Sequence, residues 1–328
     1  REGAEAPAEA EGEAPTARFP FDPLASLVLA GLAALAVFAN ISTGFDQVGI
    51  AAALAMGLGL LAIAQRYDAV SLAAPIAAVL LVVLLYFWPA AYQAASEPVT
   101  YVHGPIAAWF PLPDAIASFL SVATFGALVL VGASWRRLTT APLPGPAATI
   151  AHAAAANAGP VLVTIVAWLR VDGFVASPVF ALAALVLAGL FAAIAERFVR
   201  REAEDARAGA SVAVFATGAI AALAAGLTIA LEGGTLTSAF AASALGAAWV
   251  QVKRPIAALR WAAAALALLV LGRIAGDPYI FGVRQGAGVY LSILAGYGIP
   301  AAAFALAASL LRRIRTDRPL YAVEALAV

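Results

Sequence analysis

Two polar side chains inside an otherwise apolar stretch are the residues best suited to chemistry in this chain. His152 and Asn157 lie in the run 147–169, which is long enough to cross a membrane as a helix. Polar groups at such depth are costly in lipid and are functional candidates by default. A spacing of five residues places the two side chains about 140° apart, so they do not share one helix face. Two alternatives stay open for His152: it lines a polar path or binds a lipid headgroup, or it hydrogen-bonds a neighbouring helix.

A second set of candidates lies in two links between apolar runs, at 93–114 and 273–287. Both links are rich in Pro and aromatic residues, which is typical of chain lying in the membrane interface. Their chemically capable side chains are His103, Trp109, Arg273, Asp277, Tyr279 and Arg284. The cations among them could bind an anionic lipid headgroup or a glycan carrier. The alternative is an ion pair between Arg273 and Asp277 together with anchoring of the links in the interface.

Pro300 follows two glycines in the run 288–311, in the sequence GYGIPAAAF. Proline and glycine at this point predict a bent or broken helix. Broken helices line the transport sites of many membrane carriers, so Pro300 is a candidate substrate contact. The alternative is a simple kink.

The composition excludes most catalytic chemistry. Cysteine is absent and histidine occurs twice, which removes thiolate sites and makes a multi-histidine metal site unlikely to form. No phosphate-binding loop, Ser-His-Asp set or pair of carboxylates is recognisable, and no carboxylate lies in the middle of an apolar run. Net charge is zero, so no basic field attracts nucleic acid. We therefore expect no catalytic residue, no metal, no cofactor and no nucleic-acid partner.

The apolar runs that carry these residues define the fold class. The chain is 64% hydrophobic and 12% charged, whereas soluble domains carry about 25% charged residues. Runs of roughly 17 to 23 residues suit helices that cross a hydrocarbon core of about 30 Å, and they are too long for the strands of a barrel. The sequence predicts an all-α polytopic transmembrane helix bundle with about ten spans, at 24–41, 48–64, 72–92, 115–134, 147–169, 178–195, 209–231, 235–252, 256–272 and 288–311.

Two domains follow from composition. Residues 1–22 are rich in Ala, Pro and Glu and are expected to form a disordered tail or linker. Residues 23–328 form the transmembrane domain. Within it, 24–207 and 209–328 resemble each other at an offset of about 188, which indicates either two parallel repeats of six helices, the second truncated, or chance similarity of Ala-rich helices. The closing PLYAVEALAV reads as the start of a further apolar segment, so we expect a longer polypeptide.

The distribution of Lys and Arg predicts the orientation. If the sides of the membrane alternate from one run to the next, 16 of the 19 Lys and Arg fall on the side of the N-terminus. The other side holds Arg170, Arg273 and Arg284. Positive residues accumulate in the cytoplasm, so we expect both ends of the chain there. An excess of Ala and Arg suggests a GC-rich bacterial genome and hence a bacterial inner membrane.

Two segments carry a resemblance to a known family. The segment LEGGTLTSAFAASALGAAWVQVKRPIAALRWAAAALALLVLGRI and the later YLSILAGYGIPAAAFALAASLLRR resemble the bacterial DUF2339 family, with Tyr297, Gly298, Pro300 and Ala301 matching its Tyr-Gly-x-Pro-Ala motif. The resemblance extends over most of 24–328. It implies a large membrane protein of unknown function, and it brings no catalytic residues. Leu291 stands where the family often has a polar residue.

Three functions are consistent with these observations. The first is a non-enzymatic envelope or scaffold component that contacts membrane lipids and other membrane-protein subunits. The second is a transporter or flippase of a lipid-like or glycan-carrier substrate, and a polar cavity between the runs 147–169 and 288–311 would favour it. The third is an enzyme that modifies lipid or glycan, which requires His103, Asp277 and Arg284 to lie within about 15 Å of one another.

Overall fold

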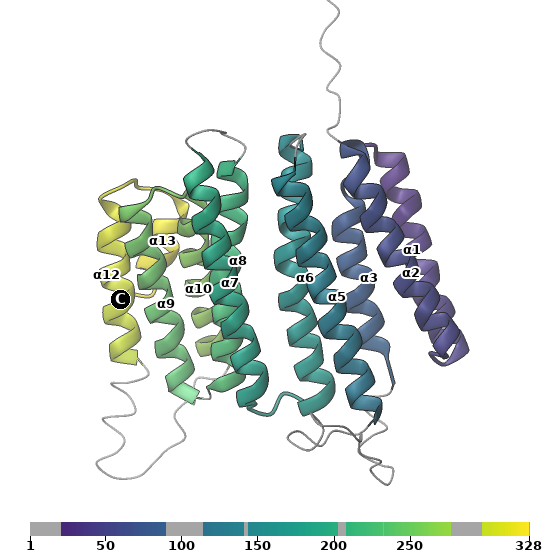
Figure 1. Ribbon diagram of the computed structural model, residues 1–328. Helices are drawn as coiled ribbons and strands as arrows, with labels where there is room; N and C mark the ends of the chain where they lie inside the picture. Colours follow the sequence, from purple (N-terminus) through teal and green to yellow (C-terminus); the bar gives the residue numbers. More distant parts are fainter. Residues whose placement is uncertain are drawn as a thin grey trace, which may run out of the picture.

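The computed structural model describes residues 21–89, 114–140, 144–202, 208–231, 233–276 and 297–327. This part of the chain is helical and contains no strand, which confirms the all-α prediction (Figure 1). Its helices are α1 (Pro23–Thr43), α2 (Gln47–Arg66), α3 (Ala73–Phe87), α5 (Asp114–Thr139), α6 (Pro146–Asp172), α7 (Pro178–Glu202), α8 (Ala208–Ala230), α9 (Gly233–Lys253), α10 (Ala257–Gly276), α12 (Ile299–Arg312) and α13 (Arg318–Glu324).

Nine helices of the described chain are long and apolar enough to cross a membrane, α3 being counted with the short turn η1 (Asp68–Val70) before it. The protein is thus a multi-pass membrane protein. The predicted tenth span corresponds to α12, which has 14 residues, and the residues 277–296 before it lie outside the described ranges. The expected tail 1–22 also lies outside them, except for its last two residues. The division into repeats 24–207 and 209–328 stays a prediction.

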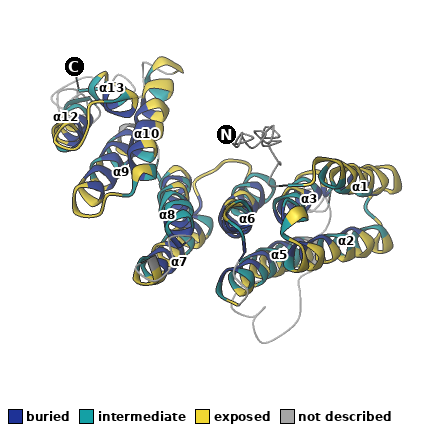
Figure 2. Cartoon of the chain, turned by 90° about the horizontal axis from the view of Figure 1, so that it is seen from above, coloured by how far each residue is buried: buried dark blue, intermediate teal, exposed yellow. Residues whose placement is uncertain are grey.

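The spans stand side by side in an elongated arrangement rather than a closed ring (Figure 2). One group contains α1, α2, α3, α5 and α6; α7 and α8 follow; α9, α10, α12 and α13 form the far end. Two thirds of the residues in the span of α6 are buried (67%), against 17% in the span of α1. Helix α6 is therefore an interior helix, and α1 is a peripheral one.

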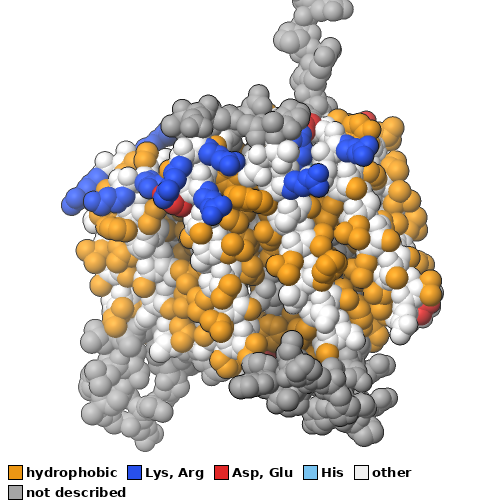
Figure 3. Space-filling model, viewed as in Figure 1, with side chains coloured by type: hydrophobic (Ala, Val, Ile, Leu, Met, Phe, Trp, Pro, Cys, Tyr) orange, Lys and Arg blue, Asp and Glu red, His pale blue; other side chains and the backbone are white. Residues whose placement is uncertain are grey.

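Cationic side chains gather at one end of the spans, which we call the basic end (Figure 3). In sequence these residues follow or precede the helix ends that meet there, such as Arg66, Arg137, Arg200 and Lys253. Exposed Trp249 and Trp261 lie within about one turn of Lys253 and Ala257. Tryptophan favours the headgroup level of a bilayer, so these two side chains place the basic end at the membrane–water interface.

The helices begin and end where local chemistry predicts. Asp22 caps α1 by accepting a hydrogen bond from the Ala25 N–H at 3.0 Å, and Pro23 occupies the first helical position, where its missing N–H costs nothing. Two tight turns at the end opposite the basic one share a Gly-Phe pair. Gly44 and Gly173 adopt left-handed conformations (φ 70° and 60°), and the phenylalanine after each is also left-handed.

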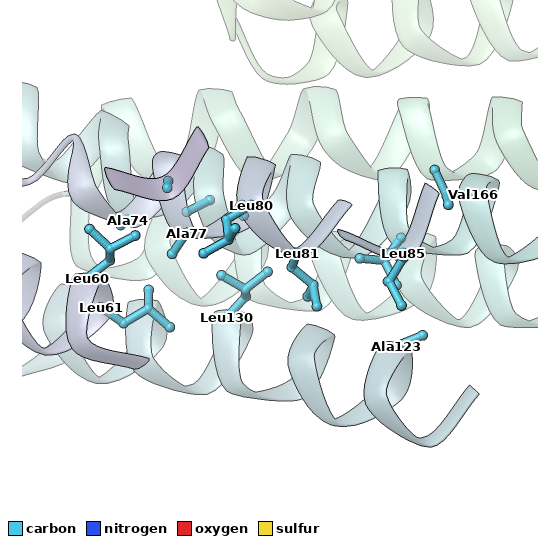
Figure 4. Packing of buried hydrophobic residues seen from close by; sticks show 14 of the residues in the cluster. Leu60, Leu61, Ala74, Ala77, Leu80, Leu81, Leu85, Ala123, Leu130 and Val166 are labelled. Atoms are coloured by element: carbon cyan, nitrogen blue, oxygen red, sulfur yellow. The ribbon is translucent and has the colours of Figure 1, made fainter. Parts of the chain in front are cut away.

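The interior is built from alanine and leucine, and close helix approach follows from the small side chains. The buried hydrophobic residues form several clusters. Figure 4 shows Leu60 and Leu61 of α2 with Leu80 and Leu81 of α3 in the largest of them. Alanine lets neighbouring backbones approach, and leucine fills the remaining volume. Two further large clusters lie around α7 and α8 and around α9, α10 and α12.

The segment after α12 forms a short helix packed inside the far group. Leu320 and Val323 of α13 are buried in the cluster formed with α9, α10 and α12. The sequence predicted the start of a further apolar segment here, and in the described chain that segment is a seven-residue helix packed against α10 and α12.

Gly126 of α5 lies where the Leu81 side chain of α3 reaches this helix. A Cβ atom at Gly126 would lie 2.5 Å from Cδ2 of Leu81, whereas a Cβ at Gly132 on the same helix meets nothing within 4 Å. We expect Gly126→Val to lower the free energy of unfolding by about 1–3 kcal/mol, because the buried Leu81 must shift to admit the new methyl groups. Gly132→Val is the matched control and should change stability by less than about 0.5 kcal/mol. Thermal unfolding in detergent measures both; equal effects would contradict the packing described here.

Candidate functional site

The polar side chains predicted within α6 are both buried and both meet the backbone of another helix. Nε2 of His152 lies 3.3 Å from the carbonyl oxygen of Ala64 near the end of α2. A carbonyl oxygen only accepts, so Nε2 carries the hydrogen in this contact. Nδ1 of His152 has no partner within the described residues. The contact joins α6 to α2 close to the basic end.

Asn157 lies on the other side of α6 and joins it to α8. Its Nδ2 donates to the carbonyl oxygen of Val214 at 2.9 Å. The amide occupies the space beside Gly218, where any Cβ atom would overlap it. Glycine at 218 is therefore required by the approach of the Asn157 side chain. His152 and Asn157 point to different helices, in agreement with the 140° predicted from their spacing.

Asp68 connects two helix ends through its carboxylate, a role that the sequence did not indicate clearly. Its carboxylate accepts from Arg137 of α5 at 2.7 Å and from the N–H of Gly145, the residue before α6, at 2.8 Å. One carboxylate thus holds the ends of two helices at the basic end. The sequence carried a weak signal for it, because a lone acidic residue between two apolar runs needs a partner when it is partly buried.

Three further polar side chains join helices in the same way. Asn40 donates from α1 to the Gly49 carbonyl of α2 at 3.1 Å. Gln65 donates from α2 to Ala133 of α5 at 2.9 Å, and Arg170 donates from α6 to the carbonyl of Trp88 at 2.7 Å. Each of these bonds links one span to another span or to the residue that ends another span.

Arg260 is a buried cation that sequence reasoning counted only as one of the basic residues. Its guanidinium lies 2.6 Å from the carboxylate of Asp317 and 2.5 Å from the carbonyl oxygen of Arg315. Asp317 also caps α13. A second ion pair, between Arg312 and Glu324, joins α12 to the last residue of α13. These contacts fix α13 against α10 and α12.

The remaining predicted site residues are placed only in part. Pro300 is buried and stands in the first turn of α12, where proline is tolerated. The π-helical residues Tyr297 and Gly298 come directly before this helix, and residues 277–296 lie outside the described ranges, so the predicted bend or break stays a prediction. Arg273 lies in the last turn of α10. The residues His103, Trp109, Asp277, Tyr279 and Arg284 lie outside the described ranges, so the clustering that an enzyme would require is not tested.

Helices α6 and α12 do not lie together. Helix α6 packs mainly against α3, α5 and α8, and α12 packs against α9 and α13. Figure 2 shows α8 and α9 between them. The polar cavity that would favour transport is therefore not formed between these two helices in the described chain.

Pockets lie between the described helices, and apolar side chains line most of each of the following three. One of about 70 Å³ lies between α2, α3 and α5, and one of about 460 Å³ lies between α1 and α3. The third, of about 830 Å³, lies between α7, α8, α9 and the start of α10 and has charged side chains at one end. We call this third pocket the α7–α9 groove.

The described residues contain no group of three or more His, Cys, Asp or Glu that could hold a metal ion. No family model, no curated protein and no solved structure matches the chain. The geometry thus offers helix-joining hydrogen bonds and apolar pockets, and the resemblance to DUF2339 stays a prediction.

The contact between Asn157 and Gly218 gives a test of this polar joint. We expect Gly218→Ala to lower the free energy of unfolding by about 1–3 kcal/mol, because the new methyl overlaps the buried amide. Asn157→Ala removes that amide together with its hydrogen bond. The double variant should then be more stable than the sum of the single effects predicts, by at least about 0.5 kcal/mol. Chemical or thermal unfolding of the four proteins measures the coupling, and strict additivity would contradict the contact.

Proposed function

We propose that this protein is a non-enzymatic structural component of the bacterial inner membrane, acting as an envelope scaffold or as a subunit of a larger membrane complex. The proposal includes membership in the DUF2339 family. Membrane lipids and other membrane-protein subunits are its proposed partners.

One observation carries the proposal: five polar side chains between the described spans join one helix to another. His152, Asn157, Asn40, Gln65 and Arg170 each meet a backbone oxygen of another helix or of the residue that ends it. A transport path needs polar groups that face a common cavity and can exchange partners. Here the same groups form five separate hydrogen bonds between helices, which is typical of a rigid helix assembly.

The shape of the molecule supports the same proposal. An elongated row of spans has far more lateral surface than a closed bundle of equal size (Figure 2). Helix α1 at one end exposes a broad apolar face that includes Leu27, Leu35 and Phe38. Such a face can lie against lipid or against the spans of another protein, and the second use would make the chain a subunit.

The alternative of a transporter or flippase lacks a specific supporting observation in the described chain. Helices α6 and α12 lie apart, and the pockets are mainly apolar. A flippase would move a labelled phospholipid between the leaflets of a reconstituted vesicle. The structural proposal expects the same rate of lipid exchange with and without the protein.

Cross-linking tests the proposed subunit role without background, because the chain has no cysteine. We expect Leu35→Cys, on the exposed face of α1, to form one adduct of fixed mass with a cysteine-reactive photo-cross-linker in native membranes. Val37→Cys on the same helix is the matched control, since Val37 faces the core and should give no adduct. Electrophoresis and mass spectrometry read the result. Absence of an adduct along the exposed face of α1, together with lipid movement in vesicles, would favour transport instead.

Orientation can be tested with the same cysteine-free background. We propose that the basic end faces the cytoplasm, because positive residues are retained there. Val175→Cys lies in the exposed turn between α6 and α7, and Thr140→Cys lies at the end of α5 that is basic. A membrane-impermeant maleimide should label Val175→Cys in spheroplasts but label Thr140→Cys only after lysis. The reverse pattern would invert the topology.

A further inference from the structure

The α7–α9 groove is the largest of the three pockets and differs from the others in its charge. Along α8 its lining runs from Val212 to Leu227, which corresponds to about 22 Å of helix. The groove is therefore longer than one leaflet of a hydrocarbon core about 30 Å thick. Its volume of about 830 Å³ lies within the range of about 300–1,000 Å³ that is common for ligand sites.

Small side chains keep the groove open. Helix α9 contributes Ala239, Ala242, Ser243 and Gly246, and a Cβ atom at Gly246 would meet nothing within 4 Å. Helix α8 contributes two alanines together with the larger Val212, Ile220, Leu223 and Leu227. The small side chains of α9 thus leave space beside the larger apolar side chains of α8. In a membrane such a space takes up apolar chains, because an empty cavity loses its dispersion contacts.

One end of the groove is charged, and it is the basic end. Arg254 bridges the groove to α7 through Glu196, with Nη1 2.9 Å from one carboxylate oxygen and Nη2 3.3 Å from the other. Arg200 lies 3.7 Å from the same carboxylate. Lys253 is exposed beside Arg254 and has no ion pair or hydrogen bond to the described residues. Two cations thus contact one carboxylate and Lys253 stands beside Arg254 in sequence, so the described side chains here carry more positive than negative charge.

Trp249 indicates the depth at which these charged side chains lie in the membrane. Trp249 lines the groove one turn before Lys253 and is exposed. Because tryptophan favours the headgroup level, the cations at the end of the groove lie where lipid phosphates lie. The long apolar part then extends from this level into the hydrocarbon.

From this arrangement we infer that the α7–α9 groove is a binding site for one anionic phospholipid. Its phosphate lies against Arg254 and Lys253, and its acyl chains lie along α8 and α9. Basic pockets between spans at the cytoplasmic face bind anionic headgroups by this combination of charge and apolar depth. The site does not depend on the proposed structural function, because a transporter or an enzyme could carry it equally.

The charge favours lipid over a helix of another protein as the occupant. A helix would fit the small side chains of α9, but its backbone and apolar side chains would leave the excess cations without an anionic partner. A phospholipid satisfies both parts of the groove at once. A second copy of this chain in the groove is an outcome that the experiment below distinguishes.

Native mass spectrometry of the full chain, released from nanodiscs that contain phosphatidylglycerol and phosphatidylcholine in equal amounts, tests the inference. We expect the wild-type protein to retain one phosphatidylglycerol in preference to phosphatidylcholine. Gly246→Leu fills the groove and should abolish most of that retention. Gly189→Leu on α7 is the matched control, because a Cβ at Gly189 also meets nothing within 4 Å and Gly189 does not line the groove.

The headgroup contact is tested separately, and it also decides the case if Gly246→Leu does not fold. Arg254→Gln should weaken phosphatidylglycerol retention about fivefold, the effect of one cation at a membrane surface. Arg136→Gln, an exposed cation on α5 at the same end, should leave retention unchanged. Equal retention of the two lipids, equal retention by Gly246→Leu and Gly189→Leu, or a dimer that Gly246→Leu dissociates would each overturn the inference.

Discussion

The absence of water from the hydrocarbon core is the constraint on which this structure depends. A backbone or side-chain polar group inside that core must find its partner within the protein. The helices satisfy their own backbones, and several polar side chains between them reach carbonyl oxygens of neighbouring helices, as Asn157 reaches Val214. Such bonds contribute on average about 0.6 kcal/mol each in membrane proteins, so they select the pairing of helices more than they supply its energy.

The energy of assembly therefore comes mainly from packing of small side chains. Gly126 lies against Leu81, and Gly218 lies against Asn157, at places where a methyl group would not fit. Where helices diverge, the same small residues leave space. In the α7–α9 groove, Ala239, Ala242 and Gly246 leave space beside the apolar side chains of α7 and α8. One composition thus produces close joints at Gly126 and Gly218 and an open groove at Gly246.

The spans and their alternation could be read from the sequence, and the contacts between them could not. Run length and the one-sided distribution of Lys and Arg depend on chemistry local to each helix, so the spans and their basic side could be assigned before the fold was known. The partner of His152 depends on which helix lies beside α6, and periodicity in an Ala-rich helix barely distinguishes its faces. For the same reason the burial of Arg260, which depends on the return of α13, had no signal in the residues around it.

The proposed lipid site follows from a feature that neither composition nor spacing predicts alone. Arg254 looks in sequence like any basic residue that retains a loop on the cytoplasmic side. Its position across the groove from Glu196 changes its role, because the guanidinium then closes the end of an apolar space at the depth of the headgroups. A loop residue can therefore set topology and hold a lipid at the same time. The two roles need the same charge at the same level, which is why a basic end and a lipid groove coincide in one molecule.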